Sequence, residues 1–165
     1  MRGNKWASLQ LSLKNVFSQI SEVSNRHLVS VINFSSKAII EIKNSEANSV
    51  DTERLTFFGG GTNFSSAFEE AFTILTKDDS NSYPILIFMT DGEGNYPNVE
   101  INKIEKLIKS SKFNDRKFQF YGLEFEAQSD IVKTIVEKLE GELKFAVGEE
   151  DLKMRYVEII TKSLE

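Results

Sequence analysis

Two polar loops of the sequence carry residue types that bind hard divalent cations. Residues 59–63 read Gly-Gly-Gly-Thr-Asn, and residues 90–92 read Thr-Asp-Gly directly after the apolar run 85–89. The hydroxyl of Thr62 and the carboxylate of Asp91 are oxygen ligands, which suit Mg²⁺, Mn²⁺ or Ca²⁺ rather than softer metals. Taken singly, each loop also has a structural explanation: Thr62 as a helix N-cap, and Asp91 with Gly92 as a turn.

Other familiar kinds of site are excluded by residue type. The glycine-rich loop lacks the Gly-Lys-Ser/Thr of a P-loop and the spacing of the dinucleotide fingerprint. The chain has no cysteine and a single histidine, His27, so thiolate metal sites, cysteine nucleophiles and multi-histidine zinc sites are excluded. We interpret His27 as a structural residue at the start of a strand.

Composition indicates one ordinary globular domain with an acidic surface. The chain has 165 residues, 40% of them hydrophobic, and a net charge of −5. This sign argues against a nucleic-acid-binding surface or an anionic-membrane surface, both of which need clustered positive charge. No apolar run reaches the roughly 18 residues that cross a bilayer, and no secretory signal is recognisable. We therefore expect an intracellular, cytoplasmic protein without membrane insertion.

The apolar spacing predicts the elements that must position the two loops. An amphipathic helix follows from residues 6–23, and strands are expected at 27–34 and 37–43. Helices are expected at 64–75, 101–108 and 131–139, with a last one opening on the acidic residues 149–151, and strands at 85–89, 117–123 and 143–147. Ser66 with Glu69 predicts a capping box, and Gly141 a C-terminal cap. The uninterrupted run 85–89 is typical of a strand buried on both faces.

Alternation of strands and helices predicts an α/β fold. We expect a doubly wound, mostly parallel sheet with helices on both faces and one antiparallel edge strand, residues 37–43. Ligands bind such sheets at the carboxyl ends of the strands. Both polar loops point to that edge.

Taken together and in this order, the loop motifs resemble a von Willebrand factor type A domain. The resemblance rests on Gly-Gly-Thr-Asn at 60–63 and on the apolar strand that runs into Thr-Asp-Gly at 90–92. It extends to residues 1–6, 29–36 and 143–156, and so spans essentially the whole chain, 1–165, as a single domain. It implies a Rossmann-like fold and a non-enzymatic module that binds protein partners.

The resemblance also implies a metal-ion-dependent adhesion site. In such a site Thr62 is a direct hydroxyl ligand of the cation, and Asp91 is a carboxylate that acts through water or from the outer shell. The cation's open position holds an acidic residue of a protein ligand. No catalytic residue and no organic cofactor are implied.

One departure from the family pattern is large. The family's first strand and the Asp-x-Ser-x-Ser motif that follows it have no counterpart here, and this motif supplies most of the cation's ligands. We therefore expect an N-terminally truncated domain that lacks its first central strand and binds a cation weakly or not at all. Strands 27–34 and 85–89 then pair directly, or another chain fills the gap, or the chain is a fragment.

An enzymatic alternative uses Asp91 for metal-assisted hydrolysis or phosphoryl transfer. Glu93 is the nearest second acid in the sequence, and no recognisable base or nucleophile stands beside Asp91. Glu124 and Glu126 follow a strand end near the proposed site. We interpret them as the ordinary alternation of polar and apolar side chains where that strand ends. The remaining acidic groups, Asp78 with Asp79 and the run 149–151, fit a solvated loop and a helix N-terminus.

Overall fold

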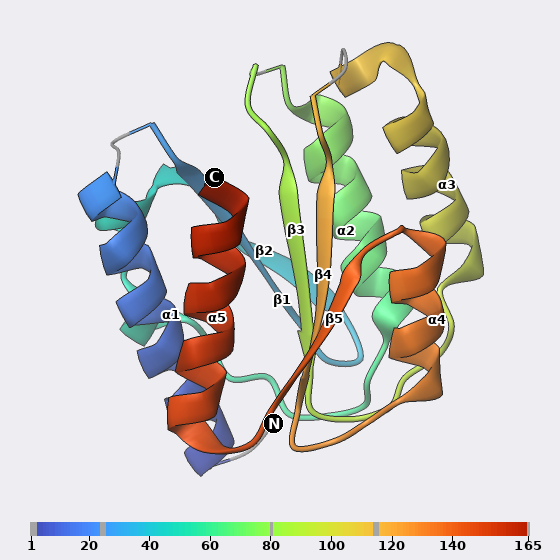
Figure 1. Ribbon diagram of the computed structural model, residues 1–165. Helices are drawn as coiled ribbons and strands as arrows, with labels where there is room; N and C mark the ends of the chain where they lie inside the picture. Colours follow the sequence, from blue (N-terminus) through green and yellow to red (C-terminus); the bar gives the residue numbers. More distant parts are fainter. Residues whose placement is uncertain (1–2, 24–25, 80, 114–115, 165) are drawn as a thin grey trace.

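The computed structural model describes residues 3–23, 26–79, 81–113 and 116–164 (Figure 1). The helices are α1 (Asn4–Val23), α2 (Phe64–Lys77), α3 (Asn98–Lys109), α4 (Asp130–Lys138) and α5 (Gly148–Leu164). The strands are β1 (Leu28–Phe34), β2 (Ala38–Glu46), β3 (Ile85–Thr90), β4 (Gln119–Phe125) and β5 (Glu142–Ala146). Short 3₁₀ turns lie at Ala47–Ser49, Thr52–Arg54 and Ser111–Phe113. Met1 and Arg2, which open the first segment of the family resemblance, lie outside the described residues.

The α/β architecture confirms the predicted fold class. Strands β3, β4 and β5 form a parallel sheet in that order, and β1 pairs with β2 antiparallel. Helices α1 and α5 lie on one side of the strands, and α2, α3 and α4 lie on the other (Figure 1). In the described part of the chain, no helix has the combination of length and apolar character that a bilayer crossing requires.

The sheet is divided between β1 and β3. Among the described strands, β1 is hydrogen-bonded to β2 and β3 is hydrogen-bonded to β4, and the two pairs belong to separate sheets. Direct pairing of β1 with β3, one of the three outcomes expected for a missing central strand, is therefore wrong. The rings of Phe34 and Phe88 instead stack across the division, with centroids 5.5 Å apart.

The division changes the burial of β3. The apolar run 85–89 predicts a strand covered on both faces, but within it only Phe88 is buried and the other four residues are partly exposed. The prediction is wrong in this respect because β3 has a neighbouring strand on one edge only.

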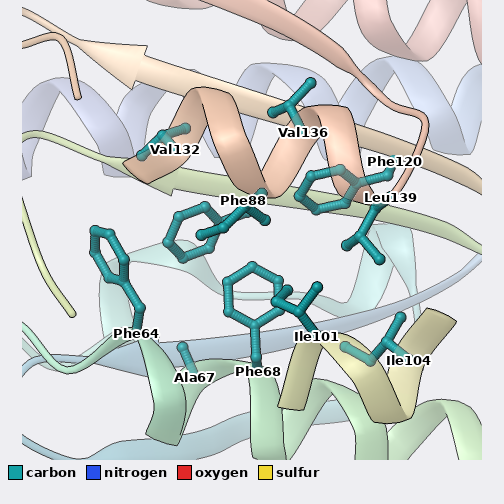
Figure 2. Packing of buried hydrophobic residues seen from close by; sticks show 11 residues of the cluster. Phe64, Ala67, Phe68, Phe88, Ile101, Ile104, Phe120, Val132, Val136 and Leu139 are labelled. Carbon is teal, nitrogen blue, oxygen red and sulfur yellow. The ribbon is translucent and has the colours of Figure 1, made fainter. Parts of the chain in front are cut away.

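Two apolar clusters hold the helices against the strands. The first cluster joins α2, α3 and α4 to the sheet. At its centre, the rings of Phe64 and Phe68 both pack against the ring of Phe88 (Figure 2). The second lies beneath α1 and α5 and includes Phe17 and Phe125. Two phenylalanines lie outside both clusters: residues 57 and 145 are 41% and 37% exposed.

Two helix ends differ from the predicted caps. The N-cap of α2 is Asn63, whose side chain accepts a hydrogen bond from the N–H of Ser66, so the capping box predicted at Ser66 and Glu69 is wrong. At the end of α4, Glu140 adopts the left-handed conformation, with φ 53°. The N–H of Gly141 donates to the carbonyl of Val136 at 2.8 Å, so the left-handed cap residue is Glu140, one residue before the predicted cap at Gly141.

These contacts predict which polar residue stabilises α2. Asn63→Ala removes the cap and is expected to lower the free energy of unfolding by about 1 kcal/mol. Glu69→Ala removes only a half-exposed ion pair with Lys103 and is expected to cost under about 0.5 kcal/mol. Urea unfolding followed by circular dichroism measures both. A larger loss of unfolding free energy for the Glu69 variant than for the Asn63 variant would support the capping box instead.

Candidate functional site

The carboxyl ends of β1 and β3 meet at the amino-terminal end of α2. We call this region the mouth and define it by residues 35–36, 59–63 and 91–95. The backbone N–H of Asn63 donates to the carbonyl of Ser35 at 2.7 Å, and its side-chain amide donates to the carbonyl of Ser36 at 3.3 Å. The glycine-rich loop is thereby held against the end of β1.

The loop after β3 is fastened to the same helix end. The side-chain oxygen of Asn95 accepts from the N–H of Phe64 at 2.9 Å, and its amide donates to the hydroxyl of Ser65 at 2.7 Å. Gly94 lies so close to the buried ring of Phe64 that a Cβ at this position would stand 2.7 Å from the ring carbons. A glycine is therefore required at this position for the loop to pack against the core.

The structure places both residues assigned to the cation at this mouth. Thr62 is exposed, and the side chain of Asp91 is 22% exposed. Both border one large cavity that extends between β1 and β3. Long-range topology thus brings together two loops that lie far apart in the sequence.

A lysine from α1 contributes the positive charge beside Asp91. The ammonium nitrogen of Lys5 lies 3.3 Å from a carboxylate oxygen of Glu126 and 4.0 Å from one of Asp91. It also stands over the ring of Phe125, 5.9 Å from the centroid. Glu126 in turn accepts a hydrogen bond from the N–H of Gly148 at 3.2 Å. A hollow of about 560 Å³ opens among these groups, bordered by α1 and the ends of β3 and β4.

The donor set at the mouth does not fit a resident metal ion. Among the described residues, no group of three or more His, Cys, Asp or Glu side chains is arranged to hold one. Thr62 and Asp91 supply two oxygen ligands, whereas Ca²⁺ takes six to eight and Mg²⁺ six. The ammonium group of Lys5 also repels a second cation from Asp91, because the two positive charges would share one carboxylate.

Glu124, which the sequence analysis places with Glu126 at a strand end, is a buried acid close to the site. It lies on β4 opposite Thr90 of β3, and its carboxylate accepts the N–H of Ser129 at 2.6 Å. Burial raises the pKa of the Glu124 carboxyl, and the hydrogen bond from Ser129 opposes part of that rise. The side chain is 4% exposed, so it supports the start of α4 rather than contacting a ligand.

The other acidic groups lie in a solvated loop and at a helix N-terminus, as the sequence analysis proposed. Asp151 accepts the N–H of Val147 at 2.9 Å at the start of α5, and Asp79 pairs with Lys112 at 3.5 Å. Sequence reasoning missed Lys5 and Asn95, which act through contacts with distant loops. No local pattern marks such contacts, although the glycine at 94 is a signal of close packing.

Comparisons with known proteins agree with this architecture. The family model for the von Willebrand factor type A domain matches residues 1–153. No curated protein matches the chain.

Two similar solved structures share its fold at low sequence identity. One is titled an aerotolerance-related membrane protein from Bacteroides fragilis NCTC 9343 with multiple mutations to serines. It is 13% identical with a TM-score of 0.56, over 93% of this chain and 88% of that one. Another, von Willebrand factor type A from Catenulispora acidiphila, is 15% identical with a TM-score of 0.65, over 93% of this chain and 37% of that one. Identities this low show the fold alone.

Glycine substitutions in the loop after β3 test how the mouth is positioned. Gly94→Ala is expected to destabilise the chain by about 1–3 kcal/mol, because the added methyl group overpacks the buried ring of Phe64. Gly92→Ala is the matched control: a Cβ there meets nothing within 4 Å. Thermal unfolding compares the two. Equal melting temperatures would show that the loop does not rest on Phe64.

Proposed function

The chain belongs to the von Willebrand factor type A family, and we propose that it is a non-enzymatic module that binds a protein partner at the mouth. Domains of this family are generally interaction modules. The observation that carries the proposal is the gathering of two polar loops, 59–63 and 91–95, around the amino-terminal end of α2. They present an exposed hydroxyl and a carboxylate where ligands of α/β sheets bind.

The anchoring of the loops supports a role in binding. Asn63 and Asn95 tie both loops to α2, so that the backbone at the mouth is held in place before a partner arrives. A preorganised surface loses less conformational freedom on association and therefore binds more tightly for the same contacts. Such loops on a rigid scaffold are a common place for recognition.

A cation enters the proposal only as a weakly held ligand. We assign Thr62 and Asp91 as the two oxygen ligands that this chain offers to Mg²⁺, Mn²⁺ or Ca²⁺, and an acidic residue of the partner as a further one. Two ligands beside the ammonium group of Lys5 are too few to keep a cation in the absence of a partner.

Substitution at the mouth tests the binding function. Thr62→Ala is expected to reduce capture of a partner from a lysate of the source cells by at least about fivefold, because it removes an exposed hydroxyl at the proposed contact. Thr134→Ala, an exposed threonine on α4, is the matched control and should leave capture unchanged. Quantitative mass spectrometry of the eluates measures both. Equal capture by both variants would place the partner elsewhere.

The same preparation tests the enzymatic alternative. Phosphatase and esterase substrates should remain unchanged in the presence of the chain. Turnover that Asp91→Asn abolishes and Asp79→Asn preserves would overturn the non-enzymatic assignment.

Magnesium titration tests the incomplete donor set. Millimolar Mg²⁺ is expected to raise the melting temperature of the chain by less than about 1 °C, because a ligand below its dissociation constant adds little stability. Differential scanning calorimetry with and without a chelator measures the shift. A rise of several degrees that Asp91→Asn removes, and Asp79→Asn does not, would show that the mouth holds a cation by itself.

A further inference from the structure

The parallel sheet has an open outer edge at β5. Among the described strands, β5 pairs with β4 on one side and has no strand on the other. Two apolar residues of β5, Leu143 and Phe145, are each 37% exposed. Both lie on the α4 face of the sheet, because a Cβ at Gly122 of β4 would meet Leu143 and Val136 of α4 together. An edge with exposed apolar side chains is a template for a further strand.

The backbone groups of β5 alternate between its two edges. The carbonyl of Ala146 accepts the N–H of Glu126 at 2.9 Å, on the side of β4. Because the direction alternates from residue to residue, the groups of Leu143 and Phe145 point to the outer edge. There the carbonyl of Phe145 accepts a hydrogen bond from Nε of Arg155 at 3.0 Å. The outer edge therefore offers a further strand both backbone groups of Leu143 and the N–H of Phe145.

The other face of β5 carries two opposite charges in a fixed order. Glu142 comes first and Lys144 second, and the ammonium nitrogen of Lys144 lies 2.6 Å from a carboxylate oxygen of Glu142. Hydrogen bonds from Lys144 and Lys162 lower the pKa of the Glu142 carboxyl, so that it is ionised at neutral pH. A strand with one acid and one base in sequence is complementary in charge to an antiparallel copy of itself.

One register satisfies both the charges and the backbone groups. In an antiparallel pair of identical strands, a twofold axis at Leu143 places Glu142 of each copy opposite Lys144 of the other. The two Leu143 residues then face each other and exchange both of their outward hydrogen bonds. The N–H of Phe145 faces the carbonyl of Gly141 in the second copy, and the ring of Phe145 covers that glycine.

The neighbouring register fails on two counts. With the axis at Lys144, the two lysines lie directly opposite each other, and like charges in that position destabilise a strand pair. The N–H of Leu143 would also need the carbonyl of Phe145, which Arg155 already occupies. The axis at Leu143 avoids both conflicts.

Helix α5 carries the same order of charges beside the strand. The carboxylate of Glu158 lies 3.8 Å from the ammonium nitrogen of Lys144. Four residues later, Lys162 forms an ion pair with Glu142. The axis at Leu143 therefore also brings Glu158 of each copy toward Lys162 of the other. Exposed ion pairs add little affinity, but they favour one register over others.

We propose that the outer edge of β5 binds the same edge of a second copy of this chain. The copies pair antiparallel about an axis at Leu143, which joins two three-stranded sheets into one continuous sheet. The occupant is a second copy because this edge complements itself in charge and in hydrogen bonding. The two mouths then face opposite ways, and a dimer holds two partners. That last consequence rests on the proposed function, whereas the pairing itself does not.

Sedimentation equilibrium of the chain tests the pairing. At loading concentrations up to about 1 mM, we expect a monomer–dimer equilibrium, because the strand contact is short and such interfaces are weak. Lys144→Glu sets acids opposite each other, Glu142→Lys sets bases opposite each other, and each is expected to weaken the dimer about tenfold. The double variant E142K/K144E restores opposite charges and should dimerise as the unaltered chain does.

A mixture of the two single variants gives a sharper test. The K144E copy offers two acidic positions to the two basic positions of the E142K copy. An equimolar mixture should therefore dimerise at concentrations where each variant alone is monomeric. Far-ultraviolet circular dichroism checks that each variant is folded. An axis at Lys144 predicts instead that Glu142→Lys alone has no effect, and that result would overturn the register.

Leu143→Lys tests the apolar contact at the axis. It places two charges where two leucine side chains meet and is expected to abolish the dimer, whereas Val99→Lys, at a 59% exposed position on α3, should leave it unchanged. The proposal fails if the chain is monomeric throughout, if the mixture dimerises no better than its components, or if V99K weakens the dimer as much as L143K does. Capture of a partner is measured separately with Thr62→Ala, so failure of either result leaves the other standing.

Discussion

The hydrogen-bond ladder that is absent between β1 and β3 is the constraint on which the rest of the structure depends. Strand β3 is joined to β4 and β5, and β1 is joined to β2, so the two sheets cohere through side chains and not through shared backbone bonds. The stack of Phe34 on Phe88 and the contacts of Phe64 with both rings carry that cohesion on the α2 side. Packing of this kind is less directional than a hydrogen-bond ladder, and it leaves a cavity between the two sheets.

The sequence was sufficient for the elements because their signals are local. Apolar spacing placed the helices and strands of the described residues within a few positions of their bounds, and the alternation of strands and helices predicted the parallel sheet. Position in the sheet was harder to predict. The run 85–89 indicates complete burial, but burial depends on a neighbour that the residues themselves do not specify.

The candidate site was predicted only in part, for the same physical reason. Thr62 and Asp91 stand in recognisable loops, and topology brings these loops to one mouth. Lys5 approaches Asp91 from α1, near the start of the sequence, and Asn95 binds the start of α2 from a loop with no motif of its own. The N-cap at Asn63 was not predicted, because Ser66 and Glu69 have the spacing of a capping box. In the structure, Glu69 instead pairs with Lys103.

The mouth is one end of the cavity that divides the two sheets, because Thr62 and Asp91 border the same cavity as β1 and β3. The division leaves β3 with a strand neighbour on one edge only among the described strands. At its carboxyl end, Asp91 lies beside the ammonium group of Lys5 and not within a larger set of acidic ligands. The weak cation contacts and the open edge of β3 therefore meet at the same place in the fold.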